Sequence, residues 1–147
     1  MYEKGQGVPQ DYARARHWFE QAAVQGVSAS QYNLGIFYQN GYGVGRDFSR
    51  ACHWYGKAAA QGYAVAQYNF GICYEKGQGM PQNYAYARDW YEKAAAQGFP
   101  DAQFNLGVLY LNGHGVPQDY ARARYWFEKA AAQGDGPAQS ALRLLQR

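Results

Sequence analysis

Small and apolar residues recur along the chain with helical spacing, in two alternating patterns. The first pattern occurs in three segments, SQYNLGIFYQNG, AQYNFGICYEKG and AQFNLGVLYLNG. In the middle segment, Ala66, Phe70, Gly71 and Tyr74 have the i, i+4, i+5, i+8 spacing that places side chains on one face of a helix. The pattern predicts helices near residues 29–40, 65–76 and 101–112.

A glycine lies in the middle of each of these predicted helices, at Gly35, Gly71 and Gly107. A glycine inside a helix costs about 1 kcal/mol relative to alanine. Its recurrence at one position therefore predicts that a neighbouring helix approaches the backbone closely there.

The second pattern predicts helices near residues 11–25, 47–61, 83–97 and 119–133. Each begins with a residue whose side-chain oxygen can accept a hydrogen bond from an early helical N–H, namely Asp11, Asp47, Asn83 and Asp119. In the first of these helices the buried stripe is expected to comprise Ala15, Trp18, Phe19, Ala22 and Ala23. Gly26 and its equivalents follow, where a left-handed residue can end the helix.

The chain contains the nine-residue segment VPQDYARAR twice, at residues 8–16 and 116–124. The offset is 116 − 8 = 108 residues, or three periods of 36. Trp18, Trp54, Trp90 and Trp126 all share this period. A fixed period of this length predicts a stack of repeated helix pairs in one domain. Its expected parts are an incomplete first unit over 1–28, helix pairs over 29–64, 65–100 and 101–136, and a C-terminal capping helix over 137–147.

The succession A-x-x-x-L-G-x-x-Y-x-x-G, then D, then A-x-x-W-[FY]-x-x-A-A-x-x-G resembles the Sel-1-like repeat family. One unit carries it in full, at Ala102, Leu106, Gly107, Tyr110, Gly113, Asp119, Ala123, Trp126, Phe127, Ala130, Ala131 and Gly134. The resemblance covers nearly the whole chain and implies an all-α fold, a right-handed α-solenoid related to tetratricopeptide proteins. It also implies a non-enzymatic scaffold, in which the first helix of each pair lines a concave surface that binds a protein partner.

By analogy with related solenoids, the concave face is expected to present an aromatic and aliphatic strip edged by amides. Its predicted partner-binding residues are Tyr32, Asn33, Ile36, Gln39, Asn40, Tyr68, Asn69, Ile72, Glu75, Lys76, Phe104, Asn105, Val108, Leu111 and Asn112. Such a surface suits a peptide or a helix, because rings bury apolar area and amides can bond a backbone. The alternative is that these rings pack inside the stack. Variation among Gln39, Glu75 and Leu111 mildly favours recognition of a partner.

Charge gives little support for nucleic acid or a membrane as partner. The chain has 147 residues and a formal net charge of only +3. Arg16, Arg88 and Arg124 align on the second helices, but Glu20, Glu92 and Glu128 follow them by four residues and are expected to pair with them. The segment MYEKGQGVPQ lacks the apolar core of a signal peptide, and the compartment stays open.

The residues give no catalytic or metal-binding set, and no cofactor is expected. His17 and His53 share a phase, but neighbouring repeats lie about 8–10 Å apart, too far for two ligands of one metal ion at about 2 Å each. His114 is expected to be exposed in a glycine-rich turn. A cysteine-rich branch of the family, with members described as penicillin-binding or β-lactamase-like, has a disulfide inside each unit. Cys52 and Cys73 do not repeat in that way, so free thiols are expected and this enzymatic alternative is disfavoured.

Two further hypotheses concern the ends of the chain and its purpose. Trp18 is expected to be poorly covered, and PAQSALRLLQR is expected to form a terminal helix. Head-to-tail self-association through these two end helices is therefore one hypothesis. Because the units are unusually alike, the main rival to a partner-binding scaffold is a structural or consensus-like repeat fragment without a ligand.

Overall fold

The computed structural model describes residues 8–146, and these form helices joined by short turns. The helices are α1 (Val8–Val24), α2 (Ser28–Asn40), α3 (Phe48–Ala60), α4 (Ala64–Lys76), α5 (Tyr84–Ala96), α6 (Pro100–Asn112), α7 (Tyr120–Ala132) and α8 (Gly136–Leu145). No strand occurs among the described residues. The helices predicted from the two patterns are confirmed to within a few residues at each end.

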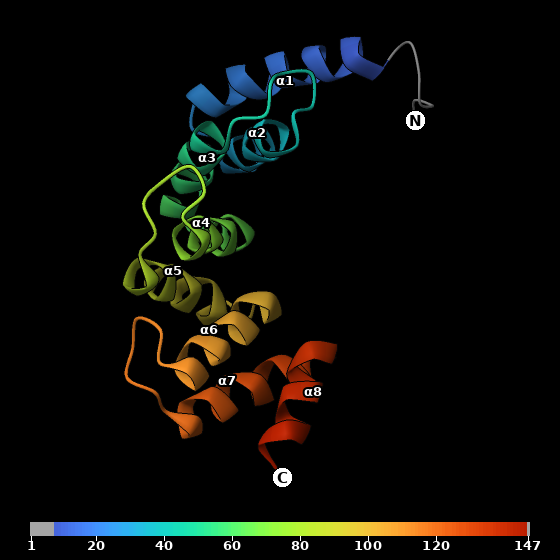
Figure 1. Cartoon of the computed structure of the whole chain (residues 1–147). Helices are drawn as coiled ribbons and strands as arrows, with labels where there is room; N and C mark the ends of the chain where they lie inside the picture. The colour runs from blue at the N-terminus through green and yellow to red at the C-terminus, as the bar shows by residue number, and fades with distance from the viewer. Residues whose placement is uncertain (1–7, 147) are drawn as a thin grey trace.

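The helices stack as antiparallel pairs into a curved α-solenoid (Figure 1). α2, α4, α6 and α8 lie along the inner side of the curve, whereas α3, α5 and α7 lie along the outer side. Each helix packs against the helices before and after it in sequence. Equivalent residues of successive units therefore lie in rows along the stack.

The starts of the outer helices α3, α5 and α7 follow the predicted capping chemistry. The side chains of Asp47, Asn83 and Asp119 accept hydrogen bonds from the backbone N–H groups three residues later, at 3.0, 3.0 and 3.1 Å respectively. The prediction for Asp11 is wrong. α1 begins at Val8, so Asp11 lies within its first turn. Pro9 is compatible with this early start. Proline has no backbone N–H group, and N–H groups in the first turn of a helix have no intrahelical acceptor in any case.

The glycines that follow the outer helices adopt the predicted left-handed conformation. Gly26, Gly62, Gly98 and Gly134 have φ values of 94°, 90°, 91° and 90°. At these positions a connection of three residues reverses the chain and leads into the next inner helix, as a left-handed residue after a helix end allows. The short connections keep successive units in one register.

The mid-helix glycines make room for aromatic rings. A Cβ atom added to Gly71 would lie 2.6 Å from Cε1 of Tyr91, and one added to Gly107 would lie 2.6 Å from Cε1 of Phe127. Gly35 has the same relation to Tyr55. The predicted close approach is confirmed, and what approaches is a ring from the next helix of the same unit. Tyr55, Tyr91 and Phe127 are among the largest fully buried side chains.

A row of glutamine side chains links each unit to the next, and the sequence patterns do not predict it. Buried Gln67 of α4 donates its amide to the carbonyl of Ala59 at the end of α3, at 3.2 Å. Gln97, after α5, donates to Oε1 of Gln67 at 2.9 Å and to the carbonyl of Gly62 at 2.9 Å. The same links recur as Gln61–Gln31–Ala23 and Gln133–Gln103–Ala95. Each buried amide is thus satisfied, which removes the cost of burying it.

The two ends of the stack present apolar side chains. Trp18 on α1 is 69% exposed, as predicted, whereas Trp54, Trp90 and Trp126 are half-buried, and Trp90 packs on Phe70 of the preceding inner helix with 5.2 Å between ring centroids. α8 forms as predicted, and its N-terminus is capped by Asp135, which accepts from the N–H of Ala138 at 2.9 Å. Leu144, near the end of α8, is 60% exposed.

The ring contact predicts that Gly71→Ala destabilises the protein although alanine is the better helix former. Overpacking typically costs about 1–3 kcal/mol, and the gain in helix propensity offsets about 1 kcal/mol. We expect a net loss of up to about 2 kcal/mol in the free energy of unfolding, measured by urea denaturation. Combining Gly71→Ala with Tyr91→Leu should make the added methyl group much less costly.

The matched control is Gly136→Ala in α8, where an added Cβ meets no atom within 4 Å. This change should leave stability nearly unaltered. An equal or greater stability of Gly71→Ala relative to the unchanged protein would contradict the proposed role of the glycine.

Candidate partner-binding face

The predicted partner-binding residues all lie on the inner helices α2, α4 and α6. These helices run side by side along the inner wall of the curve (Figure 1). Corresponding residues are 36 positions apart and therefore form rows across the three helices. Whether each side chain is available for a partner depends on its contacts inside the stack.

The three aromatic residues of the predicted strip are half-buried and pack inside the stack. Tyr32 lies 5.8 Å from Tyr55 and 5.7 Å from Tyr63, measured between ring centroids. One unit later, Tyr68 lies 6.1 Å from Tyr91 and 5.3 Å from Phe99. In the third unit, Phe104 lies 5.6 Å from Phe127. One side of each ring is thus used to join helices, and the remainder is accessible.

Two of the amides serve the same junctions. Burial raises the pKa of the Tyr32 hydroxyl, and a hydrogen bond from the Asn69 side chain partly opposes that rise. The pKa of Tyr68 is also raised by burial, and the Asn105 side chain opposes the rise in the same way. Each amide therefore contacts a hydroxyl of the preceding unit and is only partly free to bind a partner backbone.

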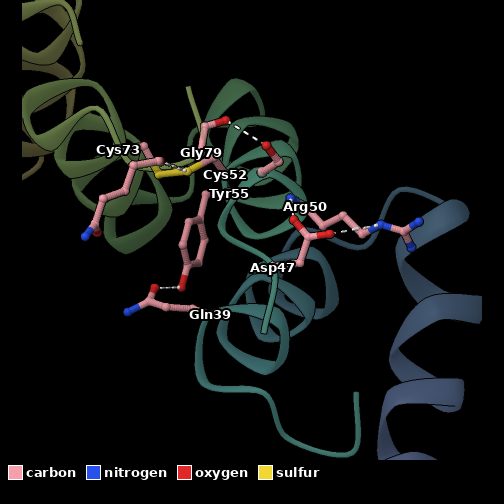
Figure 2. Close-up of a disulfide and its surroundings, with 9 residues drawn as sticks. Gln39, Asp47, Arg50, Cys52, Tyr55, Cys73 and Gly79 are labelled. Carbon is pink, nitrogen blue, oxygen red and sulfur yellow. Dashed lines mark hydrogen bonds and ion pairs between the residues drawn. A yellow bond between two sulfur atoms is a disulfide. The ribbon is translucent and has the colours of Figure 1, made fainter. Parts of the chain in front are cut away.

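Variation at one predicted site position follows the identity of a buried ring. The Tyr55 hydroxyl donates to Oε1 of Gln39 at 2.5 Å (Figure 2), and the Tyr91 hydroxyl donates to Oε1 of Glu75 at 2.5 Å. In the third unit the ring is Phe127, which has no hydroxyl, and the facing residue is Leu111. Burial raises the pKa of Tyr55 and Tyr91, so both remain protonated donors at neutral pH. This pairing explains the variation without a partner, and it removes the support that the variation gave to recognition.

The part of the strip that remains open combines aliphatic and polar side chains. Ile36, Ile72 and Val108 are half-buried in one row of the inner wall. Asn40, Lys76 and Asn112 are exposed at the C-terminal ends of the inner helices, and Asn33 is half-buried. The accessible strip is thus mainly aliphatic, with rings beside it and polar groups at one edge.

The expectation of free thiols is wrong. Cys52 of α3 and Cys73 of α4 form a disulfide, and their Cα atoms lie 6.2 Å apart (Figure 2). The two residues are 21 positions apart and lie in consecutive helices that belong to different units. The cysteine-rich branch of the family has its disulfides inside single units. Its cysteine pattern therefore could not reveal this bond, which joins two units. The packing of α3 against α4 brings the repeat positions of Cys52 and Cys73 next to each other.

The outer helices present charged and aromatic side chains, with partners that differ from unit to unit. Of the three predicted pairs, Arg16 and Glu20 form one at 3.1 Å. The other two predictions are wrong for the described residues, because Arg88 lies 2.9 Å from Asp89 instead of pairing with Glu92, and Arg124 forms no ion pair with Glu128. His114 is exposed in its turn and stacks on Tyr84, with 4.6 Å between ring centroids.

Among residues 8–146, no group of three or more histidine, cysteine or acidic residues could hold a metal ion. No described helix has the length and apolar character needed to cross a bilayer.

The pairing of ring and acceptor predicts a coupling that can be measured in a double-mutant cycle. Tyr91→Phe removes the donor and leaves Glu75 facing a ring, so we expect a loss of about 1–3 kcal/mol in the free energy of unfolding. Glu75→Leu alone leaves the buried hydroxyl without its acceptor and should also destabilise. The double variant recreates the Phe127–Leu111 pair and should recover most of the loss. Additive effects in urea denaturation would contradict the pairing.

Comparisons with solved structures agree with this architecture. The chain is 42% identical to the protective antigen c5321 of uropathogenic Escherichia coli, with a TM-score of 0.83 over 86% of this chain and 27% of that one. It is 38% identical to a Sel1 repeat protein from Oxalobacter formigenes, with a TM-score of 0.81 over 88% of this chain and 51% of that one. The chain thus spans about a quarter and a half of these two structures.

A third structure shares the fold alone. Cysteine rich protein B of Helicobacter pylori is 20% identical, with a TM-score of 0.73 over 92% of this chain and 99% of that one. No curated protein sequence matches the chain.

The family comparison matches nearly the whole chain. The Sel1 repeat model matches residues 1–27, 28–63, 64–99 and 100–135, four consecutive units with the period found in the sequence. The chain therefore belongs to the Sel1 repeat family, whose members are generally scaffolds for protein interactions and typically lack catalytic activity.

Proposed function

We propose that the inner wall of this solenoid binds an extended peptide or a helix of a partner protein. The observation that carries the proposal is the row formed by Ile36, Ile72 and Val108, which is repeated on three adjacent helices and left half-buried. Leu34 and Leu106, which lie two residues before Ile36 and Val108 and therefore on the opposite face of their helices, are fully buried. Apolar groups arranged in a continuous row can be covered by one elongated partner.

The polar residues of the predicted strip divide into two roles under this proposal. Tyr32, Tyr68, Asn69 and Asn105 contact each other across unit boundaries and support the wall. Asn40, Lys76 and Asn112 are exposed and lie where the inner helices end. These three side chains can bond the partner along one edge of the aliphatic row.

Site-specific photocrosslinking tests the proposal without disturbing the packed rings. A benzoylphenylalanine at Asn40 or Asn112 should yield a discrete crosslinked partner in extracts of the native organism. The matched control is Tyr125, which is 50% exposed on α7 of the outer side. The partner identified by mass spectrometry should then bind the purified protein in calorimetry, and Ile72→Asn should weaken that binding at least tenfold. Equal crosslinking at Tyr125 would place the interaction elsewhere.

Self-association is a second proposal, supported by the apolar side chains at both ends of the stack. Trp18 is 69% exposed on α1 and Leu144 is 60% exposed on α8. α8 has the phase of an inner helix, so α8 of one copy can pack on α1 of another as α2 packs on α3. Sedimentation velocity over a range of concentrations should show oligomers that Trp18→Asp abolishes. A single monomeric species at high concentration would refute this proposal.

A further inference from the structure

A small hollow lies at the edge of the inner wall, between α2, α3 and α4. Its volume is about 100 Å³, and its lining includes Gln39, Asn69, Ile72, Lys76 and the Cys52–Cys73 disulfide. Four of these residues belong to the predicted binding strip. The hollow therefore adjoins the surface proposed for the partner, and it is located where the inner helices end and the chain turns toward the outer side.

The hollow lies where the sequences of α3 and α4 differ from those of the equivalent helices in the other units. Cys52 occupies the position of Arg16, Arg88 and Arg124 in the other outer helices, and Cys73 occupies the position of Phe37 and Leu109 in the other inner helices. One disulfide thus stands where the neighbouring units have an arginine and a large apolar side chain. The disulfide joins α3 to α4, with Cα atoms 6.2 Å apart, and both of its cysteines line the hollow.

Two polar side chains of the lining, Gln39 and Lys76, offer donors to the hollow, whereas the amides of Asn69 and Gln78 carry both donors and an acceptor. Oε1 of Gln39 already accepts from the Tyr55 hydroxyl at 2.5 Å, which leaves the two N–H groups of its Nε2 as donors (Figure 2). Lys76 supplies the formal charge of the lining, and within residues 8–146 no carboxylate lies within salt-bridge distance of its ammonium group. The adjacent Glu75 instead accepts from Tyr91 at 2.5 Å.

Donors and one positive charge favour an anion, and the small volume limits its size. A carboxylate on a short carbon stem satisfies both conditions, because its oxygens can accept from Lys76 and Gln39 while the stem contacts Ile72 and the sulfur atoms. We propose that this hollow receives an aspartate or glutamate side chain of the peptide bound along the inner wall. The inference rests on the proposed function, since it assigns one residue of that partner.

Small probes test the hollow without a partner. N-acetyl-glutamate α-amide and N-acetyl-aspartate α-amide are titrated into the labelled protein, and NMR shifts of the side-chain amides of Gln39 and Asn69 are followed. We expect saturable binding with a Kd of about 1–10 mM for at least one of the two. N-acetyl-glutamine α-amide, which is neutral, should bind at least tenfold more weakly. Equal binding of the neutral probe, or of inorganic phosphate, would overturn the assignment to a carboxylate side chain.

Variants locate the binding. Lys76→Met should weaken binding of the carboxylate probe at least tenfold. Lys57→Met removes a different exposed lysine, on α3, and should leave probe binding unchanged. Cys52→Met/Cys73→Leu fills the hollow with uncharged atoms and should abolish binding with Lys76 in place. An intact mass two hydrogens below that of the reduced chain confirms the disulfide in the unchanged protein. Unaltered binding by Lys76→Met would refute the inference.

The outcomes separate this inference from the proposed function. Crosslinking of a partner through Asn112 together with no response to the carboxylate probes would refute the hollow and leave the inner wall as the binding face. Probe binding without any crosslinked partner would support the hollow as a carboxylate site, but it would refute the wider proposal and with it the assignment of that carboxylate to a peptide bound along the inner wall.

Discussion

The solenoid depends on the contact between a mid-helix glycine and an aromatic ring of the following helix. Gly35, Gly71 and Gly107 leave their helices without a side chain at the point where Tyr55, Tyr91 or Phe127 is buried. The rings bury a large apolar area at that point, which more than offsets the low helix propensity of glycine. Because the contact recurs in each pair, every pair adopts the same packing. Uniform pairs are what allow the glutamine row to join one unit to the next along the stack.

The same buried rings determine which residues of the inner wall can vary. A hydroxyl inside the stack requires an acceptor, so Tyr55 and Tyr91 face Gln39 and Glu75, while Phe127 faces Leu111. Differences between units at this position therefore satisfy the interior. Differences that bear on a partner must be sought at side chains without such a contact, and Asn40, Lys76 and Asn112 fulfil this condition better. In a repeat protein, variation at an inner-face position therefore indicates partner recognition only when contacts with the buried core do not account for it.

Features that repeat could be predicted from the sequence, and features that cross between units could not. The 36-residue period and the helical spacing gave the helices, and Asp47, Asn83 and Asp119 gave their starts. The pairing of Cys52 with Cys73 was missed because neither residue repeats and the bond joins two units. Gln31, Gln67 and Gln103 repeat, but a buried amide resembles an exposed one in sequence, and only packing reveals its partners. Asp11 shows a different limit of sequence reasoning. Its residue type suits an N-cap, but α1 already begins at Val8, so Asp11 lies inside the first turn of the helix.

The two units that the disulfide joins depart from the repeat at several linked positions. Gly56 stands where the other outer helices have Glu20, Glu92 and Glu128, and a Cβ added there would lie 2.9 Å from Cζ of Phe70. Phe70 in turn is larger than Leu34 and Leu106 at the equivalent position, so the lost side chain on α3 is matched by a larger ring on α4. Cys52 removes the arginine four residues before Gly56, and the disulfide then ties the same two helices together. These changes replace an arginine and a glutamate of the repeat by apolar contact and a covalent bond, and the hollow beside Lys76 lies next to that bond. These two units thus retain the common frame while sharing a surface that the other units lack, which is how a repeat protein can become specific without changing its fold.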